Sequence, residues 1–186
     1  MKTPSKKATS RANTKVISKD ATAAMTDKNG LCYYADTKVH PFLKDYFGYC
    51  FYKAAVILRM RLADSITEFG LVPPHLGILR LLKELGQHSQ NQLAEQLGID
   101  KATMVKLIDQ LQERKLIERA QDAKDRRVWR IGITSAGEKL LAKVSVIRQK
   151  VEAEFLSSLS ESERKVLLKC IPQLLDENRD LIVSDK

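Results

Sequence analysis

Two short helical segments, joined at a glycine and followed at once by a predicted strand pair, constrain the fold of this chain most strongly. The run Ser89-Gln90-Asn91-Gln92 has the pattern of a capping box, in which a serine hydroxyl and a glutamine amide satisfy free backbone N–H groups at a helix start. Gly98 suits the left-handed end of that helix, and Asp100 suits the cap of the next one. The second helix carries apolar residues at i, i+3, i+4 and i+7: Met104, Leu107, Ile108 and Leu111. This pattern predicts a helix-turn-helix.

A β-hairpin is predicted directly after this motif. Residues 116–120 lead into the charged loop 121–127, and the segment 128–133 then alternates between apolar and polar or small residues. A hairpin that follows a helix-turn-helix is a wing. The expected fold class is therefore mainly α with a small β-hairpin wing, a winged helix-turn-helix with long helices at both ends.

The N-terminal flank is predicted to be one long helix. Apolar residues at three- and four-residue steps extend over 42–69, and Gly70 ends the pattern. Pro73-Pro74 then starts a helix that Gly86 stops, because proline is tolerated where the first helical N–H has no partner. With 186 residues, the chain is expected to form a single hydrophobic core.

The C-terminal flank is predicted to contain two helices. Thr134 suits the cap of a helix running to Leu159, and Ser160 with Glu163 forms a capping box for a closing helix that extends through Leu181. The expected organisation has four parts: a disordered basic tail, 1–30; an N-terminal helix region, 31–72; the winged domain, 73–137; and the C-terminal helices, 138–186.

Charge favours a polyanionic partner, although much of the excess lies in the tail. Lys and Arg outnumber Asp and Glu by 32 to 23, and a basic excess favours nucleic acid. Residues 1–30 carry a net +5 in a Ser/Thr/Lys/Ala-rich stretch that is predicted to be disordered. No apolar run reaches the roughly 20 residues that span a bilayer, and residues 1–30 lack the apolar region of a signal peptide. We therefore expect a cytoplasmic protein without membrane contact.

No enzyme, metal or cofactor pattern is found in the sequence. Cys32, Cys50 and Cys170 form no CxxC pair, so neither a disulfide framework nor a zinc site is expected. The sequence has no nucleophile elbow, phosphate-binding glycine loop or metal-ligand set. His75, beside Pro74, is expected at the surface of a helix start.

The polar face of the second short helix is predicted to contact double-stranded DNA. An α-helix fits the major groove, and its N-terminal residues reach the base edges. Thr103 can bond a base or phosphate, Val105 can touch a thymine methyl group, and Lys106 can reach guanine acceptors or phosphate. The candidate contacts on and before this helix are Ser89, Gln90, Lys101, Ala102, Thr103, Val105, Lys106 and Gln110.

The charged loop of the hairpin supplies a second candidate DNA contact. Lys124, Arg126, Arg127 and Arg130 fall within seven residues, and arginine on a narrow hairpin can enter the minor groove. A carboxylate repels the duplex, so Asp125 is expected to brace a neighbouring arginine. We predict that Arg127 makes the wing-tip contact and that Asp125 holds it.

Over residues 42–181 the sequence resembles the MarR family of winged helix-turn-helix regulators. The segments that carry the resemblance are 92–111, Leu116-Ile117-Glu118-Arg119, Asp122-Ala123-Lys124-Asp125-Arg126-Arg127 and Ile133-Thr134-Ser135-Ala136-Gly137. Two positions depart from the family pattern: Leu116 stands where the family usually has glycine, and Val105 where it often has serine or threonine.

The resemblance implies a homodimeric transcriptional regulator in which the terminal helices of two subunits interlock. Two recognition helices about 34–36 Å apart would read a pseudo-palindromic operator. It also implies a repressor whose DNA binding is modulated by a small aromatic or phenolic ligand, held between the dimerisation helices and the winged domain.

Two alternatives remain open at this point. Some relatives sense peroxide through a cysteine in the first helix, and Cys50 lies among Tyr46, Tyr49 and Tyr52; a sensor thiol must be accessible and readily ionised. The other alternative is a winged-helix module that binds protein and has no DNA role.

Overall fold

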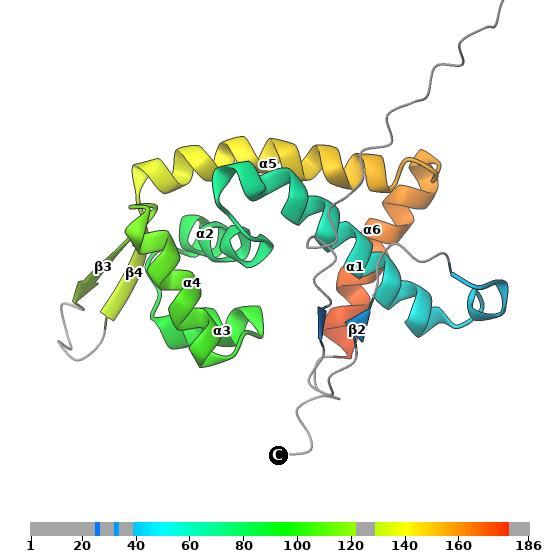
Figure 1. The fold of residues 1–186 in the computed structure, drawn as a ribbon, viewed down its shortest axis with the longest axis horizontal. Helices are drawn as coiled ribbons and strands as arrows, with labels where there is room; N and C mark the ends of the chain where they lie inside the picture. The colour runs from blue at the N-terminus through cyan, green and yellow to red at the C-terminus, as the bar shows by residue number, and fades with distance from the viewer. Residues whose placement is uncertain (1–24, 27–31, 34–38, 122–128, 179–186) are drawn as a thin grey trace, which may run out of the picture. The chain divides into compact units, whose positions relative to one another are not determined.

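The structure is a computed structural model that describes residues 25–26, 32–33, 39–121 and 129–178 (Figure 1). The chain divides into two compact units, residues 1–53 and 54–186. In the first unit, β1 (Met25–Thr26) pairs with the antiparallel strand β2 (Cys32–Tyr33). Met25 and Thr26 lie within the tail, 1–30, that the sequence predicts to be disordered, and they form this short strand; disorder of the tail stays a prediction.

The first long helix is shorter than predicted. Helix α1 spans Phe47–Ile66, whereas the apolar pattern extended over 42–69. Before it, Pro41–Leu43 forms a separate 3-10 turn, in which the Nδ1 atom of His40 accepts a hydrogen bond from the Phe42 N–H at 3.4 Å. After it, Thr67–Phe69 forms a second 3-10 turn, closed by the left-handed Gly70. Periodicity alone does not distinguish an α-helix from the tighter turns at its ends.

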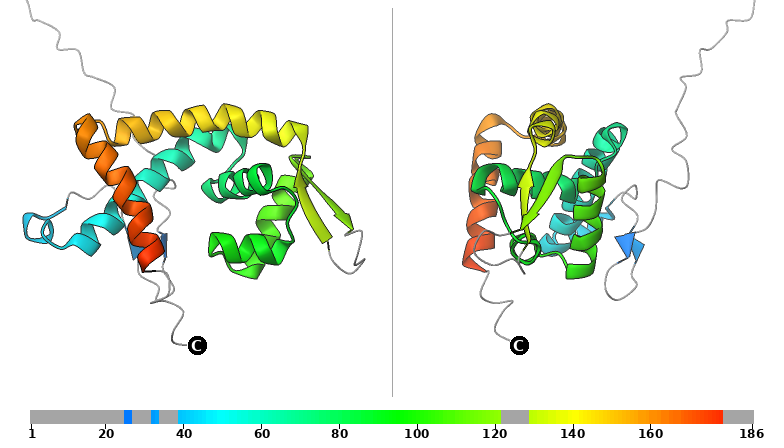
Figure 2. Two further views of the ribbon diagram at one scale, coloured as in Figure 1. Left: turned by 180° about the vertical axis from the view of Figure 1, so that it is seen from behind. Right: turned by 90° about the vertical axis from the view of Figure 1, so that its left-hand side faces the viewer.

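The remaining elements belong to the second unit. In chain order they are α2 (Pro73–Leu85), α3 (Gln90–Leu97), α4 (Lys101–Glu113), β3 (Ile117–Gln121), β4 (Trp129–Ile133), α5 (Ser135–Phe155) and α6 (Glu161–Glu177). Helix α2 packs against α3, α5 and β4, while α4 packs against α3 and β3. Figures 1 and 2 show α3 and α4 side by side, with the hairpin next to α4. The predicted mainly α fold with a two-stranded hairpin is confirmed.

The hairpin is antiparallel, and its register runs from Ile117 opposite Ile133 to Gln121 opposite Trp129. The loop between the strands, 122–128, lies outside the described residues. The segment before α3 joins the sheet as well, because His88 and Ile131 exchange two backbone hydrogen bonds of 3.1 and 2.8 Å. This bridge fixes the start of α3 relative to the hairpin.

The C-terminal helices begin at the predicted caps. The Thr134 hydroxyl accepts from the Gly137 N–H at 3.1 Å, and Ser160 and Glu163 form the predicted capping box. Helix α5 ends at Phe155 and does not reach Leu159. Arg164 explains the break: its guanidinium donates to the carbonyls of Ser157 and Leu159, which a continuous helix would use internally.

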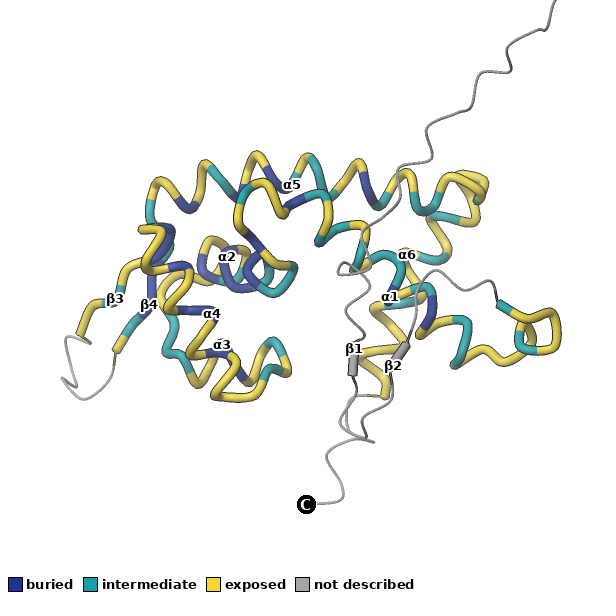
Figure 3. The backbone as a smooth tube through the Cα atoms, in the orientation of Figure 1, coloured by how far each residue is buried: buried dark blue, intermediate teal, exposed yellow. Residues whose placement is uncertain are grey.

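The core of the second unit collects the apolar faces of α2, α3, α4, α5 and the hairpin (Figure 3). All four predicted apolar positions of α4 are buried, which fixes the rotation of that helix about its axis. Figure 3 shows the contrast between this core and α6, of which no described residue is buried. No helix in the described ranges has the combination of length and apolarity that crossing a membrane requires.

Candidate nucleic-acid interface

Helix α4 presents its polar face to solvent because its opposite face is buried. Met104, Leu107, Ile108 and Leu111 point into the core. The predicted contact residues of this helix are exposed together: Lys101, Ala102, Thr103, Val105, Lys106 and Gln110. Burial of one face therefore assembles the candidate surface.

The N-terminus of α4 is held by Asp100. Its Oδ1 atom accepts a hydrogen bond from the Thr103 N–H at 2.9 Å. Hydrogen bonds from Thr103 lower the pKa of the Asp100 carboxyl, because they stabilise its charged form. The cap fixes the first turn of α4, which carries Lys101, Ala102 and Thr103.

The start of α3 lies at the edge of the same region. The Ser89 N–H donates to the Gln92 Oε1 atom at 2.9 Å, and the Gln92 N–H donates to the Ser89 hydroxyl at 3.3 Å. Ser89 and Gln90 are both half-buried. Because its hydroxyl is engaged in the cap, Ser89 has a structural role in addition to the DNA contact predicted for it.

Strand β3 is tied to α4 by an ion pair that the sequence analysis did not identify. The Nη2 atom of Arg119 lies 2.6 Å from the Oδ1 atom of Asp109. Helix spacing would pair Asp109 with Lys106, three residues before it, whereas its partner is ten residues away on a strand. Helix spacing therefore gave no signal for this pair. The pair fixes the exposed face of α4 relative to the hairpin.

A concave surface of about 580 Å³ lies between α4 and the hairpin. Its lining comes from α3, α4 and both strands: Gln90, Val105, Asp109, Gln112, Arg119 and Trp129. Trp129 is 52% exposed and Val105 is 40% exposed, so this surface offers apolar contact area beside polar groups. The predicted sites included Gln90 and Val105 but missed Trp129.

His75 lies in the interior, and the expectation that it is a surface residue is wrong. Only 2% of its surface is exposed. Its Nε2 atom lies 3.0 Å from the Gln110 Oε1 atom, and its Nδ1 atom accepts from the Val72 N–H at 3.2 Å. Burial lowers the pKa of His75. Polar residues at a helix start are usually exposed, so proximity to Pro74 gave no signal for this packing.

The described geometry contains an exposed helix face, positioned by a buried face, a cap and an ion pair, beside a two-stranded hairpin. Residues 71–129, which include these elements up to the start of β4, match the model of the MarR family. The chain carries a MarR-family domain. It is a DNA-binding transcriptional regulator, and members of this family are not enzymes.

Individual transcriptional regulators that are similar to this chain agree with this assignment. The HTH-type transcriptional regulator YsmB of Bacillus subtilis is 28% identical over 123 residues, which make up 66% of this chain and 84% of YsmB. A probable transcriptional regulator from Pseudomonas aeruginosa is 28% identical, with a TM-score of 0.65 over 71% of this chain and 98% of its own. MepR from S. aureus, solved in complex with DNA, is 26% identical, with a TM-score of 0.61 over 70% and 97% of the two chains.

The described part of the MarR hairpin includes one of the four predicted basic residues. Arg130 is half-buried, and its Nη1 atom donates to the Gln92 Oε1 atom at 3.2 Å. It therefore links β4 to the capping box of α3. Four predicted loop sites lie outside the described residues, and their roles stay predictions: Lys124, Asp125, Arg126 and Arg127.

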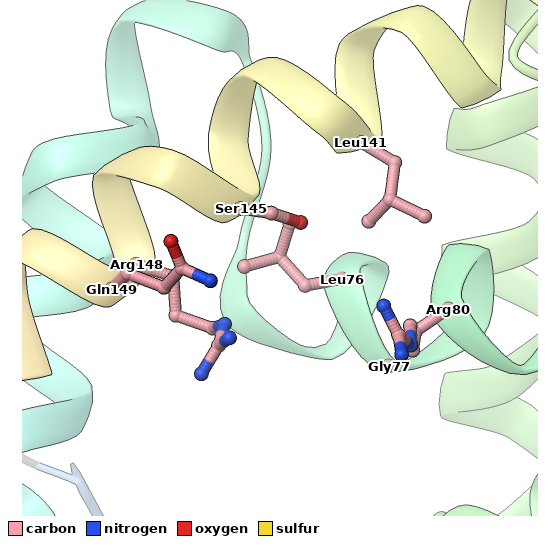
Figure 4. Close-up of a pocket in the computed structure, with 7 residues that line it drawn as sticks. All are labelled: Leu76, Gly77, Arg80, Leu141, Ser145, Arg148 and Gln149. Atoms are coloured by element: carbon pink, nitrogen blue, oxygen red, sulfur yellow. The ribbon is translucent and has the colours of Figure 1, made fainter.

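A second concave site of about 490 Å³ lies between α2 and α5 (Figure 4). Its apolar part comes from Leu76 and Leu141, its polar part comes from Arg80, Ser145, Arg148 and Gln149, and Gly77 completes the lining. Each arginine also pairs with a glutamate one turn later: Arg80 with Glu84 at 3.2 Å, and Arg148 with Glu152 at 2.6 Å. The site therefore combines an apolar wall with two guanidinium groups.

Cys50, the candidate redox residue, is half-buried in α1. Its thiol donates to the carbonyls of Leu43 and Lys44 at 3.4 and 3.5 Å. Both contacts use the thiol proton, whereas peroxide reacts with the thiolate. Peroxide sensing by Cys50 stays a prediction that these contacts do not favour.

Proposed function

We propose that this regulator is a homodimeric repressor that binds a pseudo-palindromic operator. The exposed face of α4 would read the major groove, and the hairpin would reach the adjacent minor groove. The observation that carries the proposal is the single surface formed by the exposed face of α4 next to the hairpin, held together by the Arg119–Asp109 pair at 2.6 Å. The 26% identical MepR, which is solved with DNA, supports the same use of the fold.

Individual roles on α4 follow from side-chain chemistry. Lys101, at the first position of the helix, would contact phosphate near the positive end of the helix dipole. Thr103 and Lys106 would reach base edges or phosphate, and Val105 would supply an apolar contact for a thymine methyl group. Ser89, Gln90, Ala102, Gln110 and Arg130 would border this surface.

Two substitutions test these contacts. Arg127→Ala is expected to weaken operator binding strongly and to reduce the slope of log K against log salt by about 1, as loss of one phosphate contact does. Lys106→Ala should cost about 1–3 kcal/mol of binding free energy and relax sequence preference, because it removes a base-edge contact. Fluorescence anisotropy, with a duplex selected by the wild-type protein from random sequence, measures both effects.

Lys139→Ala is the matched control, since it removes one positive charge from an exposed position on α5. It should leave affinity and salt slope almost unchanged. Wild-type affinity in both Arg127→Ala and Lys106→Ala would show that the DNA surface is elsewhere. Absence of any sequence-selective binding would favour the alternative of a protein-interaction module.

Dimerisation is supported by large apolar side chains that stay exposed to solvent in the described part of the single chain. Helix α6 exposes Val166, Leu168, Leu174 and Leu175, and the N-terminal unit exposes Phe42, Tyr46 and Phe47. Contiguous exposed apolar surface on a helix typically marks a protein interface. We propose that the second subunit covers these residues, as in the domain organisation expected from the sequence.

The crevice between α2 and α5 is proposed as the site of a modulating ligand. Its leucines can contact an aromatic ring, and the guanidinium groups of Arg80 and Arg148 can bind a carboxylate. A small aromatic or phenolic acid fits this chemistry. Such a ligand changes DNA binding only if it prefers one of two arrangements of the recognition helices.

Ligand binding can be tested by isothermal titration with benzoate. We expect heat of binding in the wild type and at least about tenfold weaker binding in Arg148→Gln, since a charge-assisted hydrogen bond contributes about 1.5–3 kcal/mol. Lys150→Gln is the control, because Lys150 is exposed on the same helix but does not line the crevice. Equal weakening in both variants would indicate a general charge effect in place of a site.

A further inference from the structure

The imidazole of His75 connects the start of α2 to α4 through two hydrogen bonds. His75 occupies the third position of α2, where glutamate or glutamine usually completes a capping box. Here the ring takes that role, since its Nδ1 atom accepts from the Val72 N–H at 3.2 Å. Its Nε2 atom faces the Gln110 Oε1 atom on α4 at 3.0 Å.

These two partners fix the protonation state of the ring. A backbone N–H can only donate, so Nδ1 must offer its lone pair to Val72. The single proton of the neutral ring then lies on Nε2 and is donated to the Gln110 side chain. Protonation of Nδ1 would place two donors against each other and break the bond to Val72. Both contacts can therefore exist together only with a neutral imidazole.

The segment before α2 holds α4 at a second point. The Arg114 Nη1 atom, just after α4, donates to the Gly70 carbonyl oxygen at 2.7 Å. Gln110 lies one helical turn from Arg114 on one side and one turn from Lys106 on the other. Of these two contacts with the segment around the start of α2, the bond to His75 is the one nearer the residues proposed to contact DNA, and it restrains the rotation of α4 about its axis.

We propose that His75 is a positioning residue for the recognition helix α4. Protonation of its imidazole breaks the bond to the Val72 N–H, so the ring that holds Gln110 is no longer fixed at the start of α2, and operator affinity falls in acid. This inference rests on the proposed function, because it needs α4 to be the DNA-reading element. His75 itself touches no DNA in this account.

The surroundings of His75 keep the ring neutral in ordinary conditions. Burial lowers its pKa most, and the positive charge of Arg114, just after α4, lowers it further, while the hydrogen bond to Gln110 raises it. A pKa that is lower in the folded state means that the stabilising neutral form is complete above the unfolded value of about 6.5. This contribution is lost as the pH falls through the folded pKa.

The expected pH dependence is opposite to the general electrostatic one. Acid adds positive charge to a protein, and added positive charge strengthens binding to phosphate. The chain has two other histidines, His40 and His88, and His88 serves as the comparison for His75. A decrease in affinity toward low pH therefore distinguishes a release of α4 from simple charge gain.

The test compares operator affinity at pH values from about 8 to about 5 for the wild-type full chain, His75→Gln and His88→Gln. Uptake of one proton can change the affinity by at most about tenfold per pH unit. We expect wild-type affinity to fall at least about tenfold over this range. His75→Gln keeps a side chain suited to the capping box, cannot titrate, and should show a flat or slightly rising profile. His88→Gln should behave as the wild type.

Gln110→Glu supplies a second readout, because a carboxylate beside Nε2 favours the imidazolium. It should move the midpoint of the pH profile upward, whatever its effect on absolute affinity. Circular dichroism at each pH verifies that the protein is folded.

Parallel profiles in the wild type and His75→Gln would overturn this inference and leave the proposed function intact. Loss of the pH dependence in His88→Gln, with its retention in His75→Gln, would also overturn it. Failure of the wild type to bind any selected duplex at any pH would instead overturn the proposed function.

Discussion

At the residue scale, Gly137 shows how one missing side chain determines local packing. It is buried in the first turn of α5, and its N–H donates to the Thr134 hydroxyl. A Cβ atom built on Gly137 would lie 2.1 Å from the Leu116 carbonyl oxygen, which is backbone and cannot rotate away. The carbonyl is itself fixed by the Thr134 N–H at 3.1 Å. The glycine in the family-like segment 133–137 is therefore a steric requirement.

We expect Gly137→Ala to lower the free energy of unfolding by at least about 2 kcal/mol, because the added methyl overlaps backbone in a packed site. Urea denaturation followed by circular dichroism measures the change. Gly48→Ala is the control: a Cβ there meets nothing within 4 Å, and alanine in a helix is favoured over glycine by about 0.5–1 kcal/mol. A change of similar size and sign in both variants would contradict the steric explanation.

At the element scale, the turn between α4 and β3 contains one residue with a strained, left-handed backbone. This residue lies one position before the one at which the family resemblance placed the usual glycine. The usual family glycine was aligned with Leu116, but Leu116 is buried, and the left-handed residue is Lys115, with φ of 57°. The Lys115 carbonyl accepts from the Thr134 hydroxyl at 2.8 Å, so α5 helps to hold this conformation. A left-handed backbone is costly for any residue with a Cβ atom.

Lys115→Gly should therefore raise the free energy of unfolding by up to about 1 kcal/mol. Glycine relieves the left-handed strain, but part of this gain is lost because glycine makes the unfolded chain more flexible. Thermal unfolding is a sufficient measurement. Lys115→Ala retains the Cβ atom and should give no gain. If alanine stabilised the protein as much as glycine, removal of the lysine charge, and not the backbone, would be the cause.

At the scale of the whole molecule, helix α6 has no buried residue within its described range, although it exposes four large apolar side chains. A helix of this composition gains most of its stability by packing. The second subunit of the proposed homodimer would supply that packing.

Replacing Leu168 and Leu175 together by aspartate is expected to convert the dimer to monomer in sedimentation experiments, because it places charges in an apolar interface. The melting temperature of the wild type should rise with protein concentration, whereas that of the variant should not. Lys169→Asp, on the same helix, is the matched control for added negative charge. A monomeric wild type would end the dimer proposal.

Much of the local structure was predictable because its causes are local. Caps at Ser89, Asp100, Thr134 and Ser160 each depend on residues no more than three positions apart, and all four occur where the sequence placed them. Boundaries set by distant or unusual contacts were not predictable. Arg164, for example, ends α5 by binding carbonyls five and seven residues before it.

The sequence by itself determined the order of the elements, the caps and the buried face of α4, because each follows from periodicity or from neighbours within a few residues. Only the tertiary structure decided which polar groups are joined: Asp109 to Arg119, Arg130 to Gln92, and Gln110 to His75. Each of these contacts connects residues that are 10 to 38 positions apart. Packing of the apolar faces brings them together, and no local spacing encodes the result.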